Sequence, residues 1–123
     1  MSDLESGGLF DGSQRPGVYQ LVAPAQWLVG ALEDAGWSCR VLDPVSDLHS
    51  FYTQTAERMG FSSTFGANLD ALWDALTDLE EPTALVLLEW TRFATEEPAQ
   101  WERVLEVLTE RTESPPPFAV ILA

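Results

Sequence analysis

Three aspartates at helical spacing, Asp70, Asp74 and Asp78, are the residues best placed to do chemistry in this chain. Two neighbouring carboxylates can act as general acid and general base, as in glycosidases. That role needs surroundings that separate their pKa values, and adjacent turns of one exposed helix face do not provide them. A binding surface for a basic partner is therefore the main hypothesis, and a merely solvated acidic face is the alternative.

Other groups able to do chemistry are scarce, because the chain has one histidine, His49, and one cysteine, Cys39. His49 lies off the apolar stripe of its expected helix, which indicates a surface residue rather than a ligand or base. Cys39 falls in an expected strand, where it is predicted to be a small core residue. No metal-ligand spacing and no phosphate-binding glycine pattern occurs in the sequence. We therefore expect no metal, no cofactor and no enzymatic activity.

The three aspartates lie on an expected short helix whose other face is apolar. Its apolar residues recur at i, i+3, i+4 and i+7, and are Leu69, Leu72, Trp73 and Leu76. Asn68, the only asparagine in the chain, is the expected N-cap. Carboxylates at i, i+4 repel one another by a few tenths of a kcal/mol per pair, and no Lys or Arg stands between them. This avoidable strain favours a function for the acidic face.

The composition predicts one folded, strongly acidic domain. A chain of 123 residues with 46% hydrophobic residues and five Trp can form a core, which a disordered acidic tail cannot. The formal net charge of -14 repels nucleic acid and anionic membranes and attracts a basic protein. A single cysteine, no signal-peptide pattern and no bilayer-spanning run lead us to expect a cytoplasmic protein that is monomeric when free.

The first 37 residues predict a tail followed by a strand and a helix. Residues 1–16 are expected to be a flexible tail in which Leu9 and Phe10 are the side chains suited to dock. A short strand is expected to begin at Val18, and the helix after it is expected to end at Gly36. The apolar face of that helix is formed by Trp27, Leu28, Ala31 and Leu32.

The rest of the chain alternates strands with helices. With a strand at 37–43, residues 18–43 form an expected βαβ unit. Ser46 is the expected cap of a helix that ends at Gly60, and Pro98 is expected to open another helix. Two runs are continuously apolar, as in strands covered on both faces of a parallel sheet, and they are residues 84–88 and 118–122.

The stretch from Gly66 to Asp74, with Leu85 to Trp90 after it, resembles the barstar family. Members of this family are intracellular protein inhibitors of the secreted ribonuclease barnase. The likeness runs from about residue 38 to the end of the chain. It implies a three-layer α/β fold with a small parallel sheet packed by helices. We expect one domain over residues 17–123, with an additional strand and helix at 17–37 before the family core at 38–123.

The resemblance also implies a mechanism, in which aspartates take the place of RNA phosphates in a basic active site. Asp74 matches the family residue that reaches deepest into the ribonuclease. We expect an inhibitor, or immunity protein, of a barnase-like ribonuclease or related toxin. The alternative is an acidic interaction module of the same fold that binds a non-nuclease partner without inhibition. The expected partner-binding residues are Thr64, Phe65, Gly66, Asn68, Asp70, Asp74, Asp78 and Glu110.

Three positions near the expected site depart from the family pattern. The loop before the helix usually presents two adjacent aromatic residues, and here Phe65 is preceded by Thr64. The pattern has a small residue where Asp78 stands and an aromatic residue where Leu79 stands. Part of the contact with the partner is therefore expected to differ from that of the family.

Overall fold

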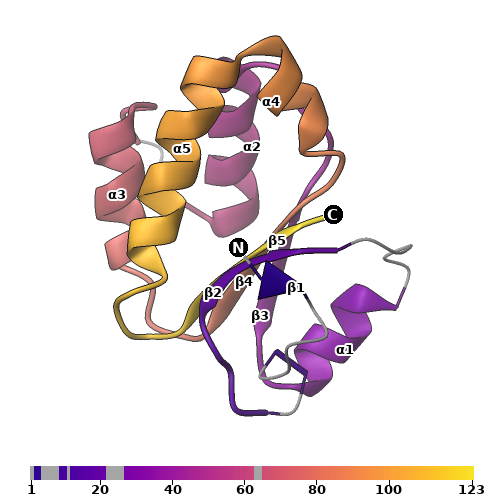
Figure 1. Cartoon of the computed structure of the whole chain (residues 1–123). Helices are drawn as coiled ribbons and strands as arrows, with labels where there is room; N and C mark the ends of the chain where they lie inside the picture. The colour runs from indigo at the N-terminus through magenta and orange to yellow at the C-terminus, as the bar shows by residue number, and fades with distance from the viewer. Residues whose placement is uncertain (1, 4–8, 11, 22–26, 63–64) are drawn as a thin grey trace.

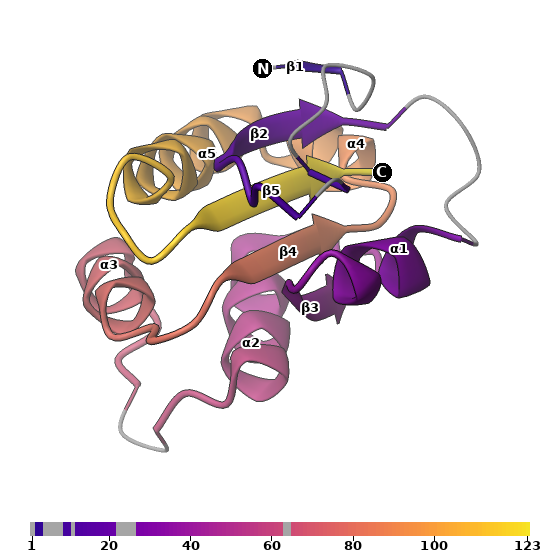
Figure 2. The same cartoon turned by 90° about the horizontal axis from the view of Figure 1, so that it is seen from below.

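The structure, a computed structural model, describes residues 2–3, 9–10, 12–21, 27–62 and 65–123. Within these residues five strands form one parallel sheet in the order β1-β2-β5-β4-β3 (Figures 1 and 2). The strands are β1 (Ser2–Asp3), β2 (Gly17–Gln20), β3 (Ser38–Leu42), β4 (Thr83–Leu87) and β5 (Phe118–Leu122). The helices are α1 (Leu28–Asp34), α2 (Leu48–Met59), α3 (Leu69–Thr77), α4 (Thr91–Glu96) and α5 (Pro98–Arg111). The expected α/β fold with a small parallel sheet is confirmed.

β4 and β5, which carry most of the two apolar runs, lie next to each other inside the sheet and are buried along their whole length. Successive side chains of a strand point to opposite faces of a sheet. Leu85 and Leu87 of β4 therefore join one core, whereas Ala84 and Val86 join another. A strand with a core on each face cannot alternate with polar residues, which explains the unbroken apolar runs.

Helices cover both faces of the sheet and give three layers (Figure 1). The larger core lies under α2, α3, α4 and α5, and Phe51, Leu72, Phe93 and Leu108 are fully buried there. The smaller core lies under α1. Its large buried side chains are Leu9, Tyr19, Leu28, Leu32 and Trp37. None of the helices in the described part of the chain is both long and apolar enough to cross a membrane.

The prediction of a βαβ unit over residues 18–43 is wrong, because its two strands are not neighbours in the sheet. β2 pairs with β5 in parallel register, and β3 pairs with β4, so two strands separate β2 from β3. Local pattern predicts the elements but not a pairing that depends on the other end of the chain. The additional N-terminal unit extends the sheet and pairs the edge of β5.

Leu9 and Phe10 dock on the domain, as expected. Leu9 is 0% exposed, and the indole Nε1 of Trp37 donates a hydrogen bond of 2.8 Å to the Leu9 carbonyl oxygen. Phe10 is half-buried, and its ring centroid lies 5.3 Å from that of Trp27. The prediction that Trp27 lies on the buried face of its helix is wrong, since Trp27 is 51% exposed beside the first residue of α1.

The cap of α2 is one residue later than expected. Asp47, not Ser46, is the N-cap, and its carboxylate accepts a 2.7 Å hydrogen bond from the backbone N–H of Ser50. This hydrogen bond lowers the pKa of Asp47. Gly60 ends the helix in the left-handed conformation, with φ of 72°, as predicted.

The burial of Leu9 predicts that residues before β2 are needed for stability. Leu9→Ala should lower the free energy of unfolding by about 2–5 kcal/mol, because it opens a cavity in the smaller core. Val29→Ala is the matched control, since Val29 is 36% exposed on α1 and its truncation should change stability by about 0.5 kcal/mol or less. Urea unfolding of both variants measures this. Equal stabilities for the two variants would contradict the docking of Leu9.

Candidate functional site

Asn68 fixes the start of the acidic helix α3. Its Oδ1 accepts a 2.8 Å hydrogen bond from the backbone N–H of Ala71, and its Nδ2 donates a 3.3 Å hydrogen bond to the carbonyl oxygen of Gly66. The predicted N-cap is therefore confirmed. Ala67, between Gly66 and Asn68, has a φ of 50°. This left-handed conformation is energetically unfavourable for any residue that has a Cβ atom. One side chain thus holds both the helix and the strained loop that precedes it.

The two faces of α3 separate largely as the periodicity predicts. Leu72 and Leu76 are fully buried, and Leu69 is half-buried against the larger core. Trp73 is only half-buried, so its assignment to the core needs correction. The three carboxylates lie outside, and Asp70, Asp74 and Asp78 are all exposed.

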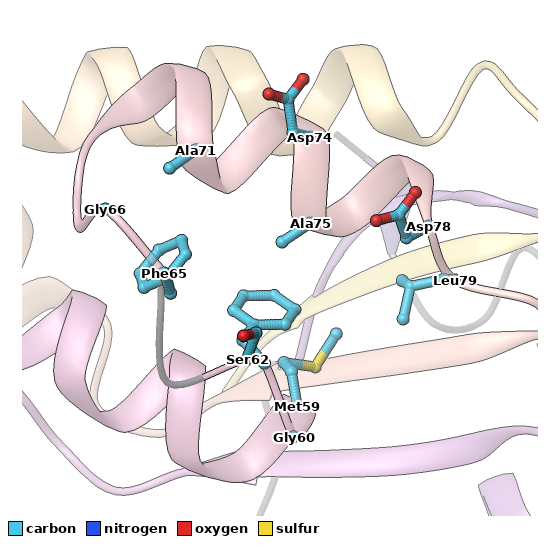
Figure 3. Close-up of a pocket in the computed structure, with 11 residues that line it drawn as sticks. Met59, Gly60, Ser62, Phe65, Gly66, Ala71, Asp74, Ala75, Asp78 and Leu79 are labelled. Carbon is cyan, nitrogen blue, oxygen red and sulfur yellow. The ribbon is translucent and has the colours of Figure 1, made fainter.

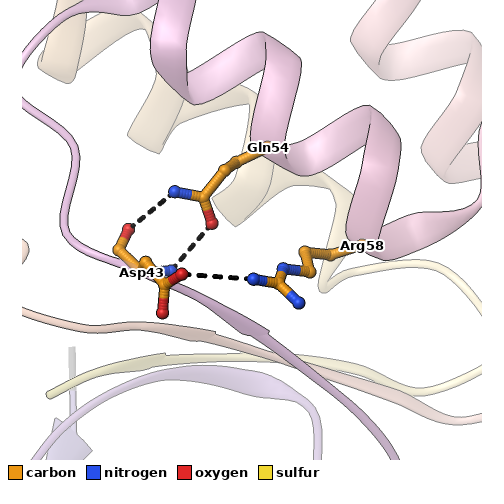
Figure 4. Close-up of polar contacts among 3 residues, drawn as sticks. All are labelled: Asp43, Gln54 and Arg58. Atoms are coloured by element: carbon orange, nitrogen blue, oxygen red, sulfur yellow. Dashed lines mark hydrogen bonds and ion pairs between the residues drawn. The ribbon is translucent and has the colours of Figure 1, made fainter.

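The carboxylates of α3 form no ion pair with any of the described residues. Three arginines form ion pairs elsewhere, and the pairs are Arg40–Glu81 at 3.9 Å, Arg58–Asp43 at 3.1 Å and Arg92–Glu89 at 3.4 Å. Figure 4 shows how Arg58 and Gln54 of α2 converge on Asp43. None of these ion pairs involves a carboxylate of α3.

Arg111, at the last turn of α5, anchors the carboxyl end of α3. Its side chain is buried, and its Nε donates a 2.7 Å hydrogen bond to the Leu76 carbonyl oxygen. Nη1 donates to the carbonyl oxygens of Ser114, at 2.6 Å, and Pro116, at 3.2 Å. Burial lowers the pKa of this guanidinium. A cation at the end of α3 also complements the negative end of the helix dipole.

Arg111 is not among the residues predicted from the sequence, although the sequence carries a signal for it. The buried residues of α5 are Trp101, Val104, Leu108 and Arg111, so the arginine continues the apolar stripe at helical spacing. An arginine in such a position either breaks the stripe or finds acceptors inside the protein. In this chain it finds carbonyl oxygens.

A groove of about 400 Å³ runs between α3, the end of α2 and the loop that joins them (Figure 3). Phe61 and Phe65 lie on the loop side, with ring centroids 5.2 Å apart. The ring centroid of Phe65 also lies 6.1 Å from that of Tyr52. Asp74 and Asp78 line the α3 side. Figure 3 shows the Asp74 carboxylate pointing away from the hollow, on the side of α3 opposite Ala75. The acidic face is therefore bordered by a hollow that periodicity alone does not predict.

The other expected site residues are placed as follows. Phe65 is half-buried in the aromatic cluster, and Gly66 is exposed beside it. Glu110 is exposed near the end of α5, which lies along α3 (Figure 1). Thr64 lies outside the described residues. His49 is exposed, and no group of three or more possible metal ligands occurs in the described part of the chain.

Comparison with known proteins identifies one family. The family model described as barstar (barnase inhibitor) matches residues 40–123, from within β3 to the end of the chain. The match includes α3, the groove, Glu110 and Arg111, and it leaves out β1, β2 and α1. No curated protein matches the chain.

The cap at the start of α3 gives a prediction on stability. Asn68→Ala should lower the free energy of unfolding by about 1 kcal/mol, because it leaves the Ala71 N–H without its acceptor. Asn68→Asp keeps an acceptor and should retain most of the stability. Thermal and urea unfolding of the two variants measure the difference. If the aspartate variant loses as much as the alanine variant, the cap is not the source of the effect.

Cys39 gives a prediction on chemical reactivity. Burial, with the charge of Glu33 as a smaller cause, raises the pKa of this thiol to about 11. The raised pKa keeps the sulfur protonated at pH 8, so alkylation by iodoacetamide should be about a hundredfold slower than in the urea-denatured chain. The rate should climb until about pH 11. Equal rates for the native and denatured chains at pH 8 would show that the thiol is not protected.

Proposed function

The chain belongs to the barstar family, and from this premise we propose that it is a protein inhibitor, or immunity protein, of a barnase-like ribonuclease or related toxin. The observation that carries the proposal is the exposed face of α3, where three carboxylates form no ion pair within the described structure. This face lies within the residues that match the family model.

A ribonuclease must present cations to bind the phosphates of its substrate, and α3 offers oxygens of the same charge. Carboxylates at i, i+4 repeat about every 6 Å along one face. Each carboxylate can accept a bidentate pair of hydrogen bonds from an arginine. Such contacts would cover the basic site and exclude RNA, with Asp74 at the centre and Asp70 and Asp78 on either side.

The rigidity of α3 supports this mechanism. The helix is held at its start by Asn68 and at its end by Arg111, and the loop before it is packed by Phe61 and Phe65. A surface that is ordered before binding loses less conformational entropy in the complex. Glu110, on the neighbouring α5, extends the acidic surface beyond α3.

The alternative function, binding to a non-nuclease partner without inhibition, is favoured by Asp78 and Leu79. Both residues line the groove beside the acidic face, and both depart from the family pattern. A cleavage assay discriminates the two functions. Increasing amounts of the chain should abolish RNA cleavage by barnase or a related ribonuclease at a one-to-one ratio. A ribonuclease that binds the chain and stays fully active would overturn inhibition.

Substitution of Asp74 separates function from fold. Asp74→Ala should leave stability unchanged or raise it by a few tenths of a kcal/mol, because it removes repulsion from Asp70 and Asp78 and improves helix propensity. The affinity for the ribonuclease should fall by about 2–5 kcal/mol, which is about 30-fold or more, because partner cations are left buried and unpaired.

Glu96→Ala is the control for Asp74→Ala, since Glu96 is an exposed carboxylate on α4, away from α3 (Figures 1 and 2). It removes the same charge and should keep nearly full affinity. Calorimetric titration and thermal unfolding of both variants give the two quantities. An Asp74→Ala protein that melts clearly lower and binds like the wild type would make Asp74 a structural residue.

A further inference from the structure

The groove beside α3 combines an apolar body with an acidic rim. Its apolar side chains are Met59, Phe61, Phe65, Ala71, Ala75 and Leu79. The charged side chains among the described residues that line it are Asp74 and Asp78. Ala71 and Ala75 face the hollow from α3 (Figure 3), and their small size leaves its volume of about 400 Å³ open. Solvent-exposed apolar walls next to uncompensated charge suit a ligand that is itself both apolar and charged.

The negative charge of Asp78 destabilises α3 at the position where it stands. It is the C-cap of α3, where the helix dipole disfavours an anion, and it lies one turn from Asp74. The family pattern has a small residue at this position. No ion pair compensates Asp78 in the described part of the chain. A cation bound beside Asp78 would offset both the unfavourable interaction with the helix dipole and the repulsion from Asp74.

None of the arginines in the described part of the chain lines the groove. Arg58 precedes Met59, one of the lining residues, but its guanidinium is held by Asp43 at 3.1 Å (Figure 4). A purely apolar side chain from a partner would fill the groove and leave the Asp78 carboxylate desolvated without a partner, which is costly. A long basic side chain avoids that cost, because it buries its stem along apolar surface and keeps its charge at the edge.

We propose that the groove receives one arginine side chain of the partner, and that Asp78 selects the partner by this contact. The stem lies against Phe65 and Ala75, and the guanidinium lies beside the Asp78 carboxylate. Arginine fits better than lysine, since its planar group stacks on an aromatic ring and can donate two hydrogen bonds to one carboxylate. That the partner is a ribonuclease rests on the proposed function, whereas the preference of the groove for arginine does not.

An NMR titration with short peptides tests the groove without any ribonuclease. The probe is acetyl-Gly-Arg-Gly-amide, and the control peptide carries citrulline, which has the same shape and no charge. The arginine peptide should shift the backbone amide signals of Gly66, Ala71, Ala75 and Asp78. The citrulline peptide should bind about two- to fivefold more weakly, as expected for loss of a solvent-exposed ion pair. Equal shifts for both peptides, or shifts only outside the groove, would overturn the proposal.

Matched variants locate the contact. Asp78→Asn should weaken binding of the arginine peptide about two- to fivefold. Glu80→Gln removes the same charge from an exposed residue that does not line the groove, and it should bind like the wild type. Ala75→Leu should remove the shifts by filling the groove, with the signals of α3 still those of a folded helix. Asp78→Asn and Glu80→Gln variants with equal affinity would show that net charge, not the groove, attracts the peptide.

The outcomes for the groove and for the proposed function are distinguishable. A chain that inhibits a ribonuclease but fails the peptide titration keeps its function and loses the arginine site. A chain that passes the titration but inhibits no barnase-type ribonuclease keeps the arginine site and loses the proposed function.

Discussion

One buried guanidinium holds together the parts of this structure that present the acidic helix. Arg111 is 1% exposed, and its hydrogen bonds connect the last turn of α3 to the segment between α5 and β5. Its guanidinium also lies 5.5 Å from the ring centroid of Phe118, the first residue of β5. Burying a charge is costly unless polar groups satisfy it, and here backbone carbonyl oxygens do so. Because these acceptors carry no net charge, the anchor leaves every carboxylate of α3 free to face a partner.

This arrangement separates the energetics of folding from those of binding. Leu72 and Leu76 stabilise α3 by burial, whereas Asp70, Asp74 and Asp78 contribute mutual repulsion and no ion pair in the described residues. Repulsion of a few tenths of a kcal/mol per pair is small beside the burial of a leucine, which contributes about 1.5–3 kcal/mol. The fold therefore tolerates a face whose charges are stabilised only when cations of a partner meet them.

Features set by neighbouring residues are predictable from this sequence, and features set by distant ones are not. The Asn68 cap, the end of α2 at Gly60 and the start of α5 at Pro98 follow from local backbone chemistry. The pairing of β2 with β5 depends on residues about 100 positions apart. The groove and the acceptors of Arg111 likewise arise only when α2, α3 and α5 have packed. Ser46 and Asp47 are both good caps, so composition alone does not decide between them.

The measurement that tests the role of the acidic helix most directly is the association rate constant of the chain with a barnase-type ribonuclease, followed by stopped flow as ionic strength rises. Charge-steered association is screened by salt, whereas dissociation from a packed interface changes much less. A steep fall of the association rate constant, with a nearly constant dissociation rate constant, is the predicted result. An association rate constant that stays flat from low to high salt would contradict capture of a basic partner by α3.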